Sequence, residues 1–340
     1  MIFYASLAVS AIIGFAVSYV LGFIVIPWLH KLKYGQTILD IGPKWHKKKE
    51  GTPTMGGVLF IVGTLVAFVV GFCVLRTIEI ESSTTLKAAE INVKVWGGIL
   101  MALGFTVIGF VDDYIKVVKK RNLGLTIKQK TFLQLLVSIG YLGSLHSVGA
   151  DYMFIPFLGN YNTGILFWVF GIFVIYCTTN AVNFTDGIDG LCGSVTLTAA
   201  AAFIVAAALR GYFQVSVLSA SLLGGCAGYL MWNKYPAKVM MGDTGSMFLG
   251  GMVVALAYAI DTPLLILPFG IIYVIEFASD IIQIVYYKAT GGKRVFKMAP
   301  IHHHFEMSGW KETKIVKVFT TINIIGCIIG LLLVYYGRPG

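Results

Sequence analysis

Uncharged stretches about as long as a membrane is thick recur along the whole chain. A helix needs roughly 20 predominantly apolar residues to cross the hydrocarbon core of a bilayer, and ten segments meet this requirement. They lie near residues 6–29, 55–75, 95–115, 131–149, 161–180, 191–209, 211–231, 244–260, 262–287 and 316–337. The pattern predicts an all-α polytopic membrane protein with about ten transmembrane helices, forming a single domain over residues 1–340.

The ninth of these segments differs from the others in its polar content. It contains Pro263 and Pro268, followed by Glu276 and Asp280. Proline removes a backbone hydrogen-bond donor and interrupts a helix, and a broken span is tolerated where the protein covers it. We therefore expect a bent ninth helix. The sequence assigns no role to the two acids.

The positive charge is distributed unevenly between the connections. The net charge of +10 would suggest nucleic acid in a soluble protein, but 57% of the residues are hydrophobic, and in membrane proteins Lys and Arg set the orientation. If the N-terminus lies outside, the cytoplasmic connections hold 21 of the 26 basic residues. The outer side keeps only Arg76, Lys87, Lys94, Arg210 and Arg338. We expect an outside N-terminus and no nucleic-acid partner.

Aspartates gather on the predicted cytoplasmic side. Asp112 and Asp113 end the third segment in GFVDDYIK, Asp186 and Asp189 follow the fifth in TDGIDGL, and Asp243 precedes the eighth in MMGDTGS. Each one alone is compatible with a solvated helix end or a turn. Together, on one side of a chain with 12% charged residues, they indicate an active site, because acids at the membrane edge are usually functional.

Carboxylates without cysteine favour a hard cation such as Mg²⁺ or Mn²⁺ over Zn²⁺. Three consecutive histidines, His302 to His304, cannot all point one way on a helix, so a zinc tripod is disfavoured, and we expect them to meet phosphate oxygens. The basic stretch KWHKKKEGTPTMGG (44–57) enters a helix. It suits a phosphate at the helix N-terminus or an anionic lipid surface, and both readings stay open.

Five motifs in this order resemble those of the polyprenyl-phosphate N-acetylhexosamine-1-phosphate transferases, and within them the phospho-N-acetylmuramoyl-pentapeptide transferases. The motifs are GTPTMGG (51–57), FVDDYIK (110–116), NFTDGIDGL (183–191), MGDTGS (241–246) and APIHHHFE (299–306). The resemblance covers the whole chain and implies ten spans with a cytoplasmic-face active-site cleft and a bent ninth helix. It also implies a homodimer in the bacterial plasma membrane.

The resemblance further implies transfer of phospho-MurNAc-pentapeptide from UDP-MurNAc-pentapeptide to undecaprenyl phosphate, forming lipid I and UMP with Mg²⁺. By motif match, Asp243 binds the metal, Asp112 deprotonates or orients the lipid phosphate, and Asp113 is a second essential carboxylate. His302, with His303 and His304, lies at the pyrophosphate. The remaining matched residues bind substrate: Asn183, Asp186, Asp189 and Asn233 hold the uridine and its ribose, and Lys49 and Thr54 edge the nucleotide pocket.

Two positions depart from the family pattern. Met240 and Met241 stand where an aromatic residue often stacks on uracil, and Asp280 stands where an apolar residue is expected. Direct attack by the lipid phosphate and a covalent aspartyl intermediate both remain open.

Two other functions compete with this one. A sister transferase that uses UDP-GlcNAc would carry similar acids, although PTMGG and PIHHHFE favour the muramoyl-pentapeptide branch. A transporter or flippase would place its acids near the bilayer midplane and show an inverted repeat. The main acidic clusters instead lie at one membrane edge, and the sequence shows no such repeat.

Overall fold

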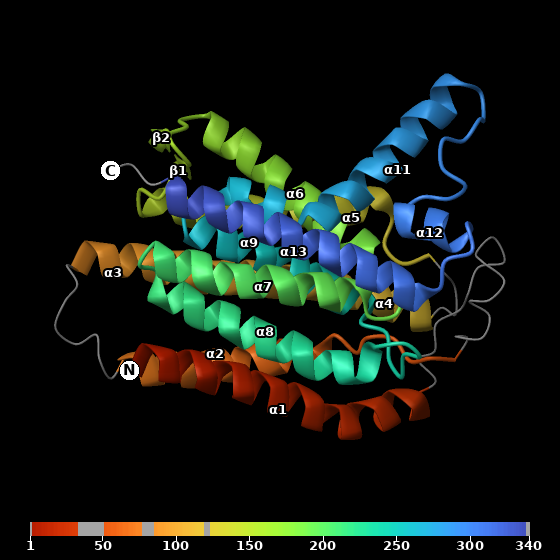
Figure 1. The fold of residues 1–340 in the computed structure, drawn as a ribbon, viewed down its shortest axis with the longest axis horizontal. Helices are drawn as coiled ribbons and strands as arrows, with labels where there is room; N and C mark the ends of the chain where they lie inside the picture. The colour runs from red at the N-terminus through yellow and green to blue at the C-terminus, as the bar shows by residue number, and fades with distance from the viewer. Residues whose placement is uncertain (1, 33–50, 77–84, 119–122, 338–340) are drawn as a thin grey trace.

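Long helices make up most of the chain, as the uncharged segments predict (Figure 1). The computed structural model describes residues 2–32, 51–76, 85–118 and 123–337, so Lys49 lies outside the described residues. The helices are Ile2–Lys31 (α1), Val58–Arg76 (α2), Thr85–Asn92 (α3), Val93–Gly97 (η3), Gly98–Val118 (α4), Ile127–Ser147 (α5), Leu166–Thr185 (α6), Leu191–Leu209 (α7), Phe213–Asn233 (α8), Gly242–Ala259 (α9), Pro263–Leu265 (η4), Ile266–Phe269 (α10), Ile271–Ala289 (α11), Ile301–Glu306 (α12) and Glu312–Tyr336 (α13).

Each of the ten predicted segments overlaps a helix of the structure. Seven helices among the described residues are long and apolar enough to cross a membrane, and the number is eight if a bent pair counts as one span. α5 and α9 are not among them, because α5 begins with several Lys and Gln residues and α9 begins with the polar sequence GDTGS. The helices agree with a polytopic membrane protein, while the number ten stays a prediction.

The predicted bend in the ninth segment is confirmed. Residues Pro263–Phe269 and Ile271–Ala289 form two helical pieces that meet at 86°. Pro263 begins the first piece and Pro268, which lacks a backbone donor, lies inside it; the break itself falls two residues later at Gly270, where the backbone leaves helical geometry (φ −123°, ψ 36°). As a result α11 projects away from the other helices, in the upper right of Figure 1.

Small residues bring α4 and α9 into close contact. A Cβ atom at Gly109 of α4 would clash with the backbone of Asp243, and one at Gly251 of α9 would lie 2.7 Å from the Cα of Ala102. Two helices whose facing positions lack side chains can pack backbone against backbone. Because the contacts join the end of α4 to the start of α9, the pair fixes the acids at those two ends against each other.

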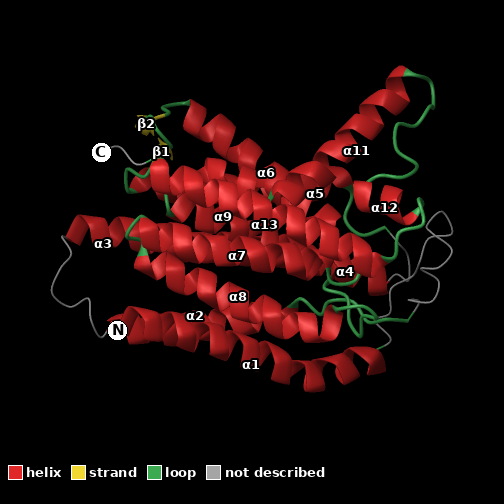
Figure 2. Ribbon diagram, in the orientation of Figure 1, coloured by secondary structure: helices red, strands yellow, loops and turns green. Residues whose placement is uncertain are grey.

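A short hairpin was not anticipated by the all-α prediction. Strands Tyr152–Ile155 (β1) and Gly159–Asn162 (β2) pair antiparallel, with Tyr152 opposite Asn162. They lie in the connection between α5 and α6, at the end of the molecule near the C-terminus (Figure 2). The backbone N–H of Phe154 donates to the carbonyl of Asp261 at 2.6 Å, so the hairpin is fixed to the end of α9.

A buried ionic cluster lies beside this hairpin, away from the predicted active face. Lys94, expected in an outer connection, is instead 1% exposed within η3, and its Nζ lies 2.5 Å from both Glu90 Oε1 and Asp261 Oδ1. Tyr152 donates to Glu90 at 2.9 Å, and Tyr212 donates to Asp261. Buried charges persist only when they are paired and hydrogen-bonded, and this lysine meets both conditions.

Candidate active site

Three of the predicted acids converge between α4 and α9. Oxygens of Asp112, Asp113 and Asp243 all lie within 4.8 Å of one another, and within the described ranges this is the one group of three or more metal-ligating side chains that lie so close together. Asp112 and Asp113 occupy the end of α4 and are 3% exposed, whereas Asp243 lies in the first turn of α9 and its side chain is 18% exposed. The backbone contact between the two helices brings these ends together.

Two lysines balance the charge of these carboxylates. Lys116 Nζ lies 2.6 Å from Asp112 Oδ2 and 3.3 Å from Asp243 Oδ2, and Lys130 Nζ lies 2.7 Å from the same Asp243 oxygen. Ion pairs this close are strong when they are shielded from water. Neither lysine was predicted as a site residue. Lys116 follows Asp112 by four residues on one helix face, so their contact could have been predicted from that spacing. Lys130 comes from α5, and no sequence spacing predicts its contact with Asp243.

The position of Lys130 depends on a capped helix start. The Thr126 side chain accepts from the Gln129 N–H, and the Gln129 side chain accepts from the Thr126 N–H, which forms a capping box at the start of α5. Lys130 lies one turn into this helix. The capping box therefore fixes the direction from which the Lys130 side chain approaches Asp243.

Asp113 caps the start of α9. Its Oδ1 accepts from the Asp243 N–H at 3.2 Å, and its Oδ2 accepts from the Thr244 N–H at 2.9 Å and from the Thr244 hydroxyl at 2.7 Å. α9 has no cap from the residue before it. A carboxylate at a helix N-terminus satisfies free N–H groups and complements the helix dipole. Asp113 therefore holds the first turn of α9, and with it Asp243, in place.

Asn183 orients Asp243 from a third helix. At the end of α6, its Nδ2 donates to Asp243 Oδ1 at 3.0 Å and to Ser246 Oγ at 2.8 Å. With Lys116 and Lys130 on its other oxygen, the Asp243 carboxylate is held on both sides. The structure thus places Asn183, predicted to contact the nucleoside, directly against the Asp243 carboxylate.

Asp189 and Asn233 are bonded to backbone within the protein. Both are buried, at 3% and 2% exposed. Asp189 Oδ2 accepts from the Ala237 N–H at 2.9 Å, while Asn233 accepts from the Gly190 N–H at 3.0 Å and donates to the Val239 carbonyl at 2.9 Å. These bonds join the start of α7 to the connection before α9. Asp186, at the end of α6, is half-buried. From the sequence alone, an aspartate that bonds backbone, such as Asp189, is not distinguishable from one that is left to contact a ligand.

The segment entering α2 lies against the connection before α9. The Met240 N–H donates to the Pro53 carbonyl at 2.8 Å, and the Gly56 N–H donates back to the Met240 carbonyl at 2.8 Å. A Cβ at Gly242 would lie 2.7 Å from Thr54 Oγ1 and 2.6 Å from Asp113 Oδ2. Thr54 is therefore brought to the edge of the aspartate cluster.

The three histidines diverge, as expected for consecutive residues on a helix. His302 is buried with its Nδ1 3.0 Å from Glu276 Oε2, and its ring packs against Gly187 of the DGIDG motif. His303 Nδ1 lies 2.6 Å from Glu306 Oε2, and His304 Nδ1 accepts from the Lys297 N–H at 3.1 Å. Each ring thus bonds a different partner, and the His302 ring touches the DGIDG motif, which follows Asn183 at the end of α6.

Comparison with known proteins agrees with this arrangement. A family model described as glycosyl transferase family 4 matches residues 95–261, which include all three aspartates, and a phospho-N-acetylmuramoyl-pentapeptide-transferase signature matches residues 49–61. Many relatives bear the name phospho-N-acetylmuramoyl-pentapeptide-transferase, and three of them illustrate the likeness. The one from Acetivibrio thermocellus is 46% identical over 94% of this chain and 92% of its own length.

The other two relatives cover the chain equally well. The Clostridium botulinum protein is 45% identical over 95% of both chains, and the Listeria monocytogenes protein is 43% identical over 95% of this chain and 97% of its own. Such identity along nearly the full length includes the site and the apolar helices alike, and it makes this chain a multi-pass bacterial membrane protein. The chain belongs to the phospho-N-acetylmuramoyl-pentapeptide-transferase family.

Proposed function

We propose that this protein transfers phospho-MurNAc-pentapeptide from UDP-MurNAc-pentapeptide to undecaprenyl phosphate, forming lipid I and UMP in peptidoglycan biosynthesis. The observation that carries the proposal is the convergence of Asp112, Asp113 and Asp243 within 4.8 Å, beside two lysines, in a chain of this family. Phosphoryl transfer depends mainly on positioning and on charge neutralisation. A cluster of fixed carboxylates and ammonium groups is suited to both.

The donor set fits Mg²⁺. Oxygen ligands from carboxylates are those that Mg²⁺ prefers, and the side chains within 4.8 Å of one another include neither sulfur nor imidazole. Asp243, the most exposed of the three, would hold the ion. When bound, Mg²⁺ neutralises charge on the phosphates of the donor.

The remaining side chains have separate roles in this proposal. Asp112 accepts from the Leu125 N–H at 2.8 Å and pairs with Lys116, so its carboxylate has a fixed direction in which to orient or deprotonate the acceptor phosphate. Lys116 and Lys130 bind phosphate oxygens, for which an ammonium is a suitable partner. Asp113 positions Asp243, as its three accepted hydrogen bonds indicate.

Substrate contacts extend outward from this centre. Thr54 lies at the edge of the cluster, and Asp186 follows α6. His302 packs on Gly187 and bonds Glu276 of α11. We place the nucleoside beside Asp186 and the pyrophosphate between Asp243 and the histidine helix. Asp189 and Asn233 shape this region through the backbone bonds described above.

The proposal includes an orientation and an assembly. The excess of Lys and Arg in alternate connections supports a cytoplasmic active site and an outside N-terminus. Only 28% of the most apolar stretch of α1 and 33% of that of α13 are buried within the protein. The remaining apolar surface is open to lipid or to a second copy in a homodimer.

Release of UMP tests the function directly. Purified protein in detergent is given UDP-MurNAc-pentapeptide, with undecaprenyl phosphate present or absent and Mg²⁺ present or chelated. We expect release only when acceptor and metal are both present. Release from UDP-GlcNAc instead would assign the protein to the sister transferases, and no release from either donor would contradict the proposal.

A further inference from the structure

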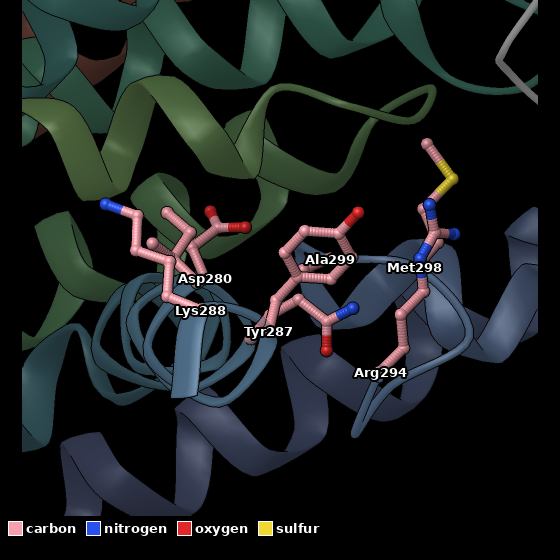
Figure 3. Close-up of a pocket in the computed structure, with 8 residues that line it drawn as sticks. Asp280, Tyr287, Lys288, Arg294, Met298 and Ala299 are labelled. Carbon is pink, nitrogen blue, oxygen red and sulfur yellow. The ribbon is translucent and has the colours of Figure 1, made fainter. Parts of the chain in front are cut away.

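A pocket of about 360 Å³ lies between the C-terminal half of α11 and the segment that leads into α12 (Figure 3). None of its lining residues belongs to the aspartate cluster or was predicted as a site residue. The lining residues are Asp280, Gln283, Ile284, Tyr287, Lys288, Arg294, Met298 and Ala299. The pocket is therefore a feature that the reaction centre does not account for.

The walls of this pocket are fixed by hydrogen bonds. Gln283 of α11 accepts from the Val295 N–H at 3.1 Å and the Phe296 N–H at 3.0 Å, and it donates to the Phe296 carbonyl at 3.2 Å. The Gly292 N–H donates to the Tyr287 carbonyl at 2.9 Å. One glutamine thus joins the connection to the helix, and the pocket is formed before any ligand arrives, which lowers the entropic cost of binding.

Three charged side chains line the pocket and form no ion pair among the described residues, although Asp280 faces Glu276, one turn away, and His302. Asp280 and Lys288 make no hydrogen bond or ion pair with the described residues, and Arg294 only reaches the Lys297 carbonyl at 3.5 Å. In Figure 3 the Tyr287 ring lies between Asp280 and Arg294. Lys288 lies on the same side of this ring as Asp280, and Arg294 lies on the other side. An acid and bases at the two ends of a largely apolar floor complement a peptide that carries both a carboxylate and an amine.

A chain of contacts connects this pocket to the aspartates. Asn183 donates to Asp243, Gly187 four residues later packs on His302, and His302 bonds Glu276, which precedes Asp280 by four residues. One turn of α11, about 6 Å, separates Glu276 from Asp280, and the step from Asn183 to Gly187 runs past the end of α6. With the direct contacts between them, the path from the cluster to the pocket is on the order of 20 Å long. Five extended residues span at most about 17 Å, and the sugar that bears them adds to this reach.

We propose that the pocket binds the peptide of the donor, with the C-terminal carboxylate at Arg294 or Lys288, the bases at its two ends, and any side-chain amine at Asp280. This inference rests on the proposed function, because it needs a donor that carries a pentapeptide. It gives Asp280, for which the family pattern offers no role, a partner of opposite charge. It also makes this end of α11 a determinant of donor specificity.

The test compares donors with and without the peptide. The variants are Arg294→Gln and Lys288→Gln, singly and together, and Lys293→Gln is the matched control because Lys293 is exposed nearby but does not line the pocket. For UDP-MurNAc-pentapeptide we expect the double variant to raise KM roughly tenfold, in line with the loss of charge-assisted hydrogen bonds. For UDP-MurNAc, measured by turnover or by competitive inhibition, we expect no change, and Lys293→Gln should match wild type with both.

A chemically altered donor identifies the group that is recognised. Amidation of the C-terminal carboxylate should raise the wild-type KM about as much as the double variant does, and the double variant should not distinguish the amidated donor from the free one. Equal losses for donors with and without peptide, or no loss with the pentapeptide donor, would overturn the inference. A wild-type protein that releases UMP from neither donor would instead refute the proposed function, which separates the two failures.

Discussion

Replacing Asp113 with asparagine tests whether this side chain holds the start of α9. In the native protein its two oxygens accept from the N–H groups of Asp243 and Thr244 and from the Thr244 hydroxyl, at 3.2, 2.9 and 2.7 Å. Asparagine keeps one acceptor oxygen and replaces the other with an amide group that donates. At least one N–H at the start of α9 therefore loses its acceptor.

The expected magnitude follows from these bonds. An unsatisfied buried donor costs about 1–3 kcal/mol, and loss of a negative charge at a helix N-terminus adds about 0.3–1 kcal/mol. We expect a destabilisation of about 2–4 kcal/mol, which lowers the apparent Tm by several degrees. Because the freed turn carries Asp243, a displacement of about 1 Å should lower kcat on the order of 100-fold.

Thermal unfolding in detergent and UMP release at saturating Mg²⁺ measure the two effects. Thr244→Val serves as the control, because it removes only the hydroxyl bond to Asp113, and it should cost about 1 kcal/mol while kcat stays within a few-fold of wild type. If Asp113→Asn kept the wild-type Tm yet lost activity by more than four orders of magnitude, Asp113 would act in the chemistry and the capping argument would be wrong.

Three further substitutions test other parts of the site. Asp243→Asn should raise the Mg²⁺ concentration for half-maximal UMP release at least tenfold, and an unchanged Mg²⁺ titration would remove Asp243 from the metal site. Gly109→Ala should separate α4 from α9 and abolish activity, whereas Gly140→Ala, where a Cβ meets nothing within 4 Å, should leave both activity and Tm near wild type. Glu276→Ala should lower the stability by about 1–3 kcal/mol, because buried His302 loses its partner; Glu276→Gln keeps an acceptor and should lose less, and equal Tm values for the two would contradict this.

The helices and the bend were predictable because lipid imposes a simple rule. Each backbone group in the bilayer must be bonded within a helix, so uncharged runs of about 20 residues predict helices, and Pro263 and Pro268 mark the break. The hairpin was missed because its two strands of four residues lie in a connection and lack a strong alternating pattern. Lys94 was assigned to an outer connection because sequence alone does not show that Asp261, far along the chain, lies beside it.

The candidate site was also only partly predictable from the sequence. Asp112, Asp113 and Asp243 were predictable as a group, since all three lie at helix ends on one side of the topology. Their separate roles were not, because the cap that Asp113 forms depends on how α4 packs against α9. Lys130 was missed for the same reason, as its α5 position meets Asp243 only in the folded chain.

Sequence patterns do not separate residues that bind a substrate from residues that shape the site. Asp189 and Asn233 lie in motifs that suggest ligand contact, and in the structure they also bond the backbone of Ala237, Gly190 and Val239. Short polar side chains often bond nearby backbone in turns. A motif can therefore mark residues that shape a site as readily as residues that touch its substrate.

The helices α3, η3 and α4 form one rod, which contacts α9 at both of its ends. Asp113 bonds the first turn of α9, and Lys94 pairs with Asp261 just past its last turn. Sliding or tilting of α9 along this rod would break one of these attachments, and the glycine contacts between them leave no room for side chains to yield. We therefore expect the carboxylates to keep their positions during turnover, and we expect motion that admits substrate or releases product to occur in the segments around this helix pair.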